Sequence, residues 1–303
     1  MVGRKNTRMI VIFLLPALFF YVLIFMYPVA RTFIMSFFAV ERIDQPLTDW
    51  TFNGLNNYTG LFSKDLFNRA ISNYLTIWFI GGLAVMALSM IYAVILTSGV
   101  RLKKFWRAVI YLPNVISAIA LGTMWLQYVY TDGHGLFDKA VALLGGKTPV
   151  LWTGPDMVIW SLVIAYCFGM VGYIMMTFIS GIEKIGVEYY EAADIEGANV
   201  IQKFFYITLP LIKGVIRSNL VIWTVHLGTG VFAWVFMFSP NNIALGTVMP
   251  PNYLYDLVFD SRASAFTQRD TGAGAAVGVF IALLVLIVSL VTTLITRRDD
   301  IEL

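Results

Sequence analysis

The sequence predicts an all-α protein of the polytopic membrane class. Of its 303 residues, 59% are hydrophobic and only 13% are charged, whereas a soluble domain carries about 25% charged residues. The apolar residues gather in long runs that can each cross a bilayer as a helix, and basic residues concentrate in alternate connections between the runs. These three observations predict one transmembrane domain over residues 1–303 with six spans, at about 9–38, 70–96, 105–130, 157–182, 215–238 and 272–296.

The first run follows three basic residues, Arg4, Lys5 and Arg8. It is too long for a signal-peptide core and lacks a convincing small-residue cleavage site, so we expect an uncleaved first span. Small residues in the second run favour close helix packing. The third run contains Pro113 and Asn114. We expect the Asn114 side chain to hydrogen-bond a backbone carbonyl that Pro113 leaves without a donor. The alternative is that Asn114 lines a polar translocation path.

The basic residues predict the topology. With both termini in the cytoplasm, that side holds 13 Lys and Arg residues and the outer side holds 7, in agreement with the positive-inside rule. The connection at about 183–213 then lies in the cytoplasm, and it is an acidic exception. Because anionic lipid headgroups repel carboxylates, a protein partner explains this acidity better than lipid does. The carboxylates are Glu183, Glu188, Glu191, Asp194 and Glu196.

This acidic connection is amphipathic, and it contains residues that end or interrupt helices. A helix is predicted from about Val187 to Glu196, and Gly197 is a plausible stop because glycine tolerates the left-handed conformation that follows a helix end. A second short helix is predicted from Gln202 to Ile207. Pro210 cannot donate a backbone hydrogen bond, so it breaks this pattern or opens the next helix.

The spacing within the connection resembles the EAA loop of permease subunits of bacterial ATP-binding-cassette importers. Glu191-Ala192-Ala193 is followed by three residues, then Gly197, nine residues, Ile207, one residue and Leu209-Pro210. In that family the loop forms cytoplasmic coupling helices that dock onto an ATPase subunit. The resemblance therefore implies ATPase-coupling roles for Glu191, Ala192, Ala193, Gly197, Leu209 and Pro210.

A second segment, Phe52–Tyr58, is similar to the FxGLxNY segment common after the first span of carbohydrate-type permeases. The early apolar run with Tyr27-Pro28 looks more like the first of two paired sugar permeases of the maltose type. The resemblance implies three kinds of protein partner. These are a paralogous second permease, two ATP-binding subunits and an extracytoplasmic solute-binding protein.

The fifth predicted span is polar for a helix in lipid. Asn219, Trp223 and His226 fall at i, i+4 and i+7 on one stripe, with Thr229 beside it. Indole rings stack on sugar rings, and amide, hydroxyl and imidazole groups hydrogen-bond sugar hydroxyls. The alternative is that these residues hold the helix against neighbouring helices by packing and hydrogen bonds. The resemblance adds Tyr173, His226 and Thr229 as positions near the sugar contacts of maltose-type importers.

These observations predict the transmembrane subunit of an ATP-driven, binding-protein-dependent oligosaccharide importer in a bacterial cell membrane, in contact with lipid. The chain itself is predicted to catalyse nothing and to hold no cofactor, metal or nucleic acid, with ATP and Mg in the partner ATPase. Gly145-Gly146-Lys147-Thr148 fails as a P-loop because Val141 occupies the position of the first glycine. A single cysteine, Cys167, permits no cysteine metal site. The alternatives are cargo of another neutral solute and a gradient-driven secondary transporter.

Overall fold

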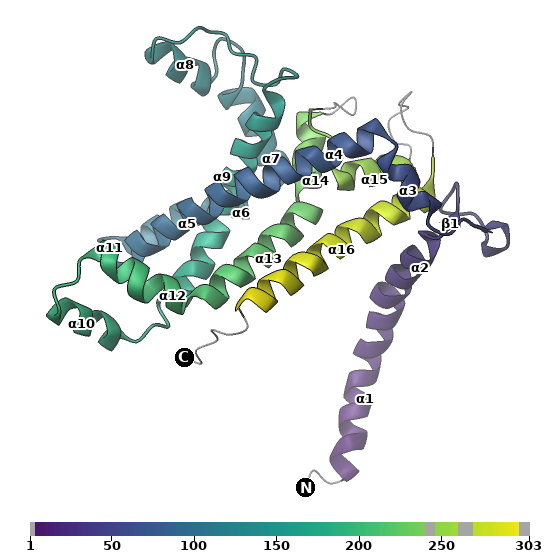
Figure 1. The fold of residues 1–303 in the computed structure, drawn as a ribbon, viewed down its shortest axis with the longest axis horizontal. Helices are drawn as coiled ribbons and strands as arrows, with labels where there is room; N and C mark the ends of the chain where they lie inside the picture. Colours follow the sequence, from purple (N-terminus) through teal and green to yellow (C-terminus); the bar gives the residue numbers. More distant parts are fainter. Residues whose placement is uncertain (1–3, 240–245, 260–268, 297–303) are drawn as a thin grey trace. The chain divides into compact units, whose positions relative to one another are not determined.

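The computed structural model describes residues 4–239, 246–259 and 269–296, and most of these residues are helical (Figure 1). Within this part, four helices are long and apolar enough to cross a membrane, or up to six if each of two bent helix pairs is one span. Three basic residues of the predicted charge bias, Arg262, Arg297 and Arg298, lie outside the described residues. The chain separates into two compact units, 1–64 with 254–282 (unit 1) and 65–253 with 283–303 (unit 2).

Unit 1 begins with the apolar stretch Met9–Met35, which corresponds to the first predicted span. It comprises α1 (Arg4–Tyr21), a π-helical turn (Val22–Met26) and α2 (Tyr27–Met35). Pro28 lacks an N–H and crowds the preceding turn, so the carbonyl four residues earlier loses its helical donor. The wide turn lies at this carbonyl, as expected where the regular ladder is interrupted.

The FxGLxNY-like segment ties the end of α2 to its surroundings in unit 1. Strand β1 (Phe38–Ala39) pairs antiparallel with β2 (Thr51–Phe52), and α3 (Asn56–Phe62) follows. The Asn57 amide donates to the carbonyls of Ser36 at 2.9 Å and Phe38 at 2.8 Å. The Tyr58 hydroxyl donates to the Ser36 hydroxyl at 2.7 Å. Asn57 and Tyr58 therefore cap the end of the first span.

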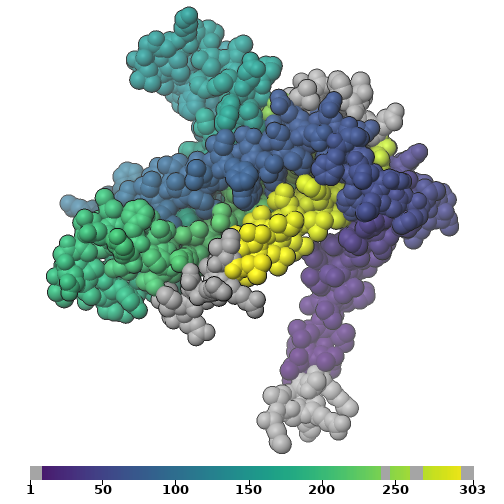
Figure 2. Space-filling view, viewed as in Figure 1, coloured from purple at the N-terminus to yellow at the C-terminus, as the bar shows by residue number. Residues whose placement is uncertain are grey.

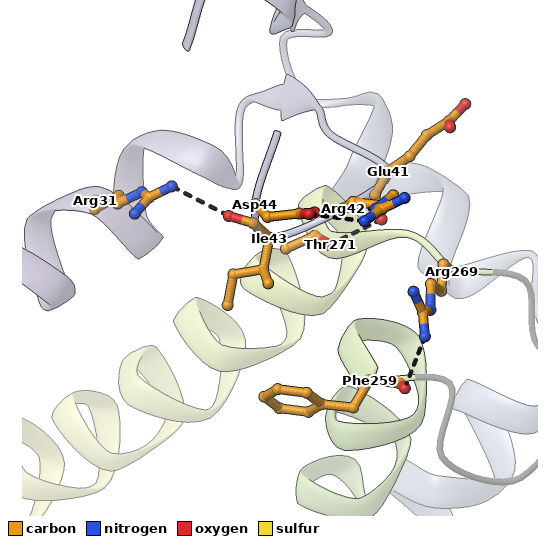
Figure 3. Close-up of polar contacts among 8 residues, drawn as sticks. All are labelled: Arg31, Glu41, Arg42, Ile43, Asp44, Phe259, Arg269 and Thr271. Carbon is orange, nitrogen blue, oxygen red and sulfur yellow. Dashed lines mark hydrogen bonds and ion pairs between the residues drawn. The ribbon is translucent and has the colours of Figure 1, made fainter. Parts of the chain in front are cut away.

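The loop between the two strands is held by polar contacts at its base (Figure 3). A 3₁₀ turn, Leu47–Asp49, lies within it. Arg31 donates to the carbonyl of Ile43 at 3.2 Å, and Arg42 pairs with Asp44 at 2.7 Å. The hydroxyl of Thr271, the first residue of α16, donates to the carbonyl of Glu41 at 2.9 Å.

Unit 2 contains most of the remaining helices. Its main helices are α4 (Asp65–Thr76), α5 (Gly82–Thr97), α6 (Lys103–Val115), α7 (Ala118–Met124), α9 (Val158–Ile182), α13 (Lys213–Thr229) and α14 (Val231–Phe238). Two further helices, α15 (Pro250–Phe259) and α16 (Thr271–Thr296), have residues in both units. Short elements complete the chain, namely the π turns Ile77–Gly81, Trp125–Val129 and Phe204–Thr208 and the helices α8 (Leu136–Leu143), α10 (Val187–Ile195), α11 (Val200–Lys203) and α12 (Leu209–Leu211).

Helix α9 is the centre of unit 2, where it packs against α5, α6, α13 and α14. Gly172 marks its closest approach to α6. A Cβ on Gly172 would lie 2.3 Å from the carbonyl oxygen of Ile110 and 2.7 Å from the Cα of Tyr111. Small residues allow such approaches between membrane helices. Gly172 is thus a packing position.

The third predicted span is broken. Helix α6 and the segment Ala118–Val129 are bent by 97° at Ile116 and Ser117. Ile116 is extended, and the Ser117 hydroxyl accepts from the backbone N–H of Ala120 at 3.2 Å as an N-cap. The Asn114 amide donates to the carbonyl of Gly169 at 3.3 Å. The carbonyl that Asn114 bonds therefore belongs to α9, which corrects the expectation of one freed by Pro113.

The fifth predicted span, 215–238, is also two helices. α13 and α14 meet at Gly230, whose backbone N–H donates to the carbonyl of His226 at 2.6 Å. On the other side, Val200–Leu211 and Lys213–Thr229 form a pair bent by 69°. Both breaks lie at the ends of the helix that carries the predicted polar stripe.

Candidate functional site

The coupling loop is residues 183–212, and its first half has the local structure that its sequence predicts. The second predicted helix, Gln202 to Ile207, is longer than expected, because the helical segment runs from Val200 to Leu211. Helix α10 ends at Ile195, and Gly197 follows with φ +75°. The N–H of Gly197 donates to the carbonyl of Asp194 at 3.1 Å, and the N–H of Ala198 donates to that of Ala193 at 2.8 Å. This pair of bonds is a Schellman motif, which satisfies the free carbonyls at a helix end. The predicted stop at Gly197 is confirmed.

In the second half of the loop, the helical structure begins again at α11, after a capping box that was not predicted from the sequence. The Asn199 side chain accepts from the backbone N–H of Gln202 at 2.9 Å, and the Gln202 side chain accepts from that of Asn199 at 2.8 Å. The signal was present as an Asn with a Gln three residues later. Pro210 lies in the first turn of α12, and a π turn precedes it, as one does before Pro28. Leu209 and Pro210 are half-buried.

Two of the five acidic residues of the loop, Glu183 and Asp194, form ion pairs within the described residues. Asp194 forms an ion pair with Lys203, which joins α10 to α11. Glu188, Glu191 and Glu196 are exposed, and within the described residues the Glu191 carboxylate has no ion-pair or hydrogen-bond partner. Ile195 is 87% exposed between them. The loop surface (green in Figure 2) therefore carries carboxylates and an apolar side chain that the chain itself leaves uncovered.

Small residues lie beside Glu191. Ala192 is exposed and Ala193 is half-buried on α10. The Tyr190 hydroxyl lies 2.9 Å from that of Thr208, so α10 is fixed to the π turn before α12. The predicted coupling residues thus belong to one internally bonded loop.

One ion pair ties the helix ends at the base of the loop. Arg107 on α6 pairs with Glu183, just after α9, at 2.6 Å. The same guanidinium donates to the carbonyl of Leu96 near the end of α5 at 3.3 Å. Arg107 therefore links the ends of three helices where the coupling loop begins.

A cavity of about 420 Å³, the Asn219 cavity, lies among α6, α9 and α13. Its polar side chains include two residues of the predicted path, Tyr173 and Asn219. The lining residues are Tyr111, Tyr173, Met176, Thr177, Ser180, Gly181, Lys184, Gly214, Val215, Ser218, Asn219 and Ile222. The cavity extends to the helix ends that enter and leave the coupling loop.

A second cavity of about 170 Å³, the His226 cavity, is lined by residues of α6, α7, α9, α13 and α14. It is bordered by Asn114, Tyr166, His226 and Trp234. The Tyr166 hydroxyl is buried and has no hydrogen-bond partner among the described residues. The rings of Tyr173 and His226 are in contact, with centroids 5.4 Å apart. This ring pair connects the linings of the two cavities.

Trp223 and Thr229 lie elsewhere. Trp223 is 0% exposed, and its indole N–H donates to the carbonyl of Trp78 at 3.1 Å. Its ring fills the space above Gly82, where a Cβ would lie 2.7 Å from the indole nitrogen. In this conformation Trp223 offers no indole face to a solute, because its ring is buried between α13 and α5. Thr229 is exposed and donates to the carbonyl of Val225 at 2.9 Å.

The loop 131–156 holds a buried carboxylate that sequence analysis missed. Asp138 on α8 is 2% exposed. It accepts from the N–H groups of Gly133 at 2.6 Å, Val150 at 3.1 Å and the Trp152 indole at 2.8 Å. Burial by itself raises the pKa of this carboxyl, but the three hydrogen bonds together hold the pKa below its usual value. No local pattern distinguishes Asp138 from a solvated loop acid, since its donors come from both ends of the loop.

Comparison with known proteins identifies the family. The family model described as binding-protein-dependent transport system inner membrane component matches residues 86–299. This chain belongs to that family.

Within the described residues there is no group of three or more His, Cys, Asp or Glu side chains that could hold a metal ion.

Several curated members of this transport family are similar over most of their length. The arabinooligosaccharides transport system permease protein AraP of Halalkalibacterium halodurans is 29% identical over 96% of this chain and 89% of its own. The probable starch degradation products transport system permease protein AmyD of Thermoanaerobacterium thermosulfurigenes is 26% identical over 99% and 97%. The diacetylchitobiose uptake system permease protein NgcF of Streptomyces coelicolor is 27% identical over 82% and 72%.

A solved structure shares the fold of this transport component. One chain of a bacterial ABC transporter involved in the import of the acidic polysaccharide alginate superposes with a TM-score of 0.80 at 21% identity, covering 98% of this chain and 97% of that one. The same transporter in complex with an alginate-pentasaccharide-bound periplasmic protein gives 0.78 at 22% identity. The chain thus has the ABC permease fold.

Proposed function

We propose that this chain is the transmembrane subunit of an ATP-driven, binding-protein-dependent importer of oligosaccharides and forms half of its translocation pore. The family match carries this proposal, because it covers both cavities and the whole coupling loop. Relatives named for arabinooligosaccharides, starch degradation products and diacetylchitobiose support a sugar cargo. A paralogous permease would complete the pore. Two ATP-binding subunits and an extracytoplasmic solute-binding protein would complete the importer.

The coupling loop supports docking onto an ATPase. Its helix end is closed by the Schellman motif, and Glu191 and Ile195 are left for a partner. A groove with an apolar floor and a basic rim would bury Ile195 and pair with Glu191. ATP and Mg would be bound by that partner, and movement of its subunits would be carried to α9 and α13 as rigid-body motion.

The cavities support a neutral, hydroxyl-rich solute. Their linings offer amide, hydroxyl and aromatic groups, and no carboxylate is among them. Lys184 and His226 are the lining residues able to carry a positive charge. Of the predicted path, Tyr173, Asn219 and His226 keep a place at these cavities, whereas Trp223 is assigned to packing and Thr229 lies outside both.

The importer is favoured over a gradient-driven transporter. Such transporters use ionisable residues within the membrane, and among the described candidate spans the sole carboxylate is Asp65, at the first residue of its helix. Another neutral solute remains the alternative cargo. We place the chain in a bacterial cell membrane, surrounded by lipid, with six spans and with both termini and the coupling loop in the cytoplasm. The 69° bend between Val200–Leu211 and Lys213–Thr229 then marks the point where the chain leaves the coupling loop and enters the fifth span. One transmembrane domain for the whole chain stays a prediction.

The test is purification of the tagged chain from its native membrane, with partners identified by mass spectrometry. Gly197→Val is compared with Gly60→Val, because a Cβ at either glycine meets nothing within 4 Å and only Gly197 has a positive φ. We expect an ATPase and a second permease with the wild type and with Gly60→Val, and loss of the ATPase with Gly197→Val. Recovery of the wild-type chain alone would contradict the importer and favour the gradient-driven alternative.

A further inference from the structure

We infer that the Asn219 cavity is a second solute station, separate from the His226 cavity, which holds a hydroxyl-bearing solute on its way to the coupling-loop side of the protein. This inference rests on the proposed function. It extends that function by dividing the path into two stations and by naming the group that binds solute at the second.

The position of the cavity supports this order. Along α9, the lining residues Tyr173, Thr177 and Ser180 fall at i, i+4 and i+7 on one stripe of the helix. Lys184, two residues beyond the end of α9, also lines the cavity. The stripe begins at the ring that contacts His226 and ends beside the coupling loop. A solute leaving the His226 cavity past Tyr173 would therefore meet this stripe next.

Asn219 supplies the strongest indication of a ligand. It is 0% exposed, and one half of its amide lies 2.6 Å from the Thr177 hydroxyl. The other half has no hydrogen-bond partner among the described residues. Because a buried polar group without a partner is costly, a group that could visit this cavity and pair with the amide would be bound.

The Thr177 hydroxyl decides which half of the amide is left over. It also lies 2.7 Å from the carbonyl of Ile174, and a hydroxyl has a single proton to donate. If it donates to Ile174, it accepts from the amide NH₂ and leaves the amide oxygen unpaired. If it donates to the amide oxygen, the NH₂ is unpaired. A sugar hydroxyl both donates and accepts, so it pairs with either arrangement.

The remainder of the lining suits the same solute. The exposed Ser180 hydroxyl and the rings of Tyr111 and Tyr173 offer hydrogen bonds and aromatic faces. The volume, about 420 Å³, falls in the range of about 300–1,000 Å³ typical of small-molecule sites. A station on a transport path must also release its solute, and a site with one unpaired amide and few charges meets that need.

The test uses the assembled importer in proteoliposomes with arabinotriose, maltotriose and diacetylchitobiose as probes. Asn219→Leu removes the amide, and Thr177→Val removes the hydroxyl that orients it. Thr76→Val is the matched control, since Thr76 likewise donates to a carbonyl of its own helix, at 2.9 Å, and lines neither cavity. We expect uptake to fall at least tenfold in the first two variants, with binding-protein-stimulated ATPase activity within twofold of wild type. Thr76→Val should match wild type in both.

A labelling experiment keeps the inference testable if Asn219→Leu does not fold. In a Cys167→Ala background, Ser180→Cys places a thiol on the exposed wall of the cavity, and the transported sugar should slow its reaction with a maleimide. Wild-type uptake by Asn219→Leu and Thr177→Val, or labelling unaffected by sugar, would overturn the second station alone. Equal loss of uptake and ATPase activity would make Asn219 a structural residue and also overturn it. Failure of the wild type to import any of the three sugars would overturn the proposed sugar function.

Discussion

The structure favours glycine both at Gly172 in α9 and at Gly197 in the coupling loop, but for different reasons. A Cβ at Gly172 would lie 2.3 Å from a backbone carbonyl of α6, in a conformation that any residue can adopt. A Cβ at Gly197 would meet nothing within 4 Å, but the backbone there has φ +75°. One glycine serves a crowded helix crossing, and the other serves a turn on an open surface.

The contrast separates two kinds of region in unit 2. At the α6–α9 crossing, residue identity is set by neighbours within the chain, so a change should damage the folded protein itself. In the coupling loop, identity is set by local backbone geometry and, in the importer that we propose, by the ATPase outside the chain. A change there should leave the isolated chain folded and damage coupling.

The largest effect is expected at the crossing. Gly172→Ala forces a methyl group against the backbone of Ile110 and Tyr111, which cannot swing aside as a side chain can. We expect a loss of about 3 kcal/mol or more in stability and little recoverable chain, measured by size-exclusion chromatography and thermal melting. Gly214→Ala, where a Cβ meets nothing within 4 Å, is the control and should behave as wild type. Normal yield and melting of Gly172→Ala would show that the two helices can separate without cost.

Substitutions at Gly197 should follow conformational preference. Asn tolerates the left-handed region better than other residues, and a β-branched residue tolerates it least. We expect binding-protein-stimulated ATPase activity to decrease from Gly to Asn to Val, with Val lowered about tenfold because the left-handed conformation costs about 1–2 kcal/mol. The amount of folded chain should stay the same. If Asn and Val were equally impaired, side-chain volume at the ATPase interface would be responsible and not φ.

Two carboxylates on α10 sharpen the comparison within the loop. Glu191 is exposed and unpaired within the described residues, whereas Asp194 is already paired with Lys203. We expect Glu191→Gln to weaken ATPase binding about tenfold, through loss of a charge pair across an interface. Asp194→Asn should change it less than twofold, since an exposed internal pair contributes about 0–1 kcal/mol. Binding of the purified ATPase to nanodisc-embedded permease measures both. The reverse ranking would place the main charge contact with the ATPase at Asp194, one turn along α10, and not at Glu191.

The smallest effect is expected in the loop 131–156. Because the folded pKa of Asp138 is depressed, its carboxylate stabilises the loop at any pH above the unfolded value of about 3.9. That stabilisation is lost as pH falls through the lower folded pKa. The protection factors of this loop, which compare its hydrogen exchange with the intrinsic rate at the same pH, should therefore fall in acid. Asp138→Asn should lower them already at pH 7 and remove most of their pH dependence, with transport little changed. Identical exchange in the two proteins would mean that the three hydrogen bonds do not hold the loop.

Helix stops and starts in the coupling loop could be predicted from sequence because their causes are local. A left-handed glycine, a capping side chain or a proline acts on carbonyls and N–H groups within a few residues. The end of α10 at Gly197 follows from this logic. The capping box at Asn199 and Gln202 could have been found by the same reasoning.

The polar stripe on α13 could be predicted only in part. Periodicity places Asn219, Trp223 and His226 on one stripe, but it does not say which neighbour each one meets. Asn219 and His226 border cavities, whereas Trp223 is buried against α5, whose Gly82 leaves room for the indole. The burial of Asp138 escaped prediction for a similar reason, since two of its hydrogen-bond donors lie more than ten residues further along the chain. The bend at Ser117 has a local N-cap, so it could have been found as the capping box could.

The sequence by itself determined the membrane class, the approximate helical runs and the geometry of the coupling loop. These follow from transfer of apolar side chains out of water and from hydrogen bonds between residues close in the chain. The tertiary structure alone decided which polar side chains stay unpaired beside a cavity and which are buried in packing. That outcome depends on residues brought together from distant helices, and their approach is set by small residues at the crossings and by the volume that facing side chains fill.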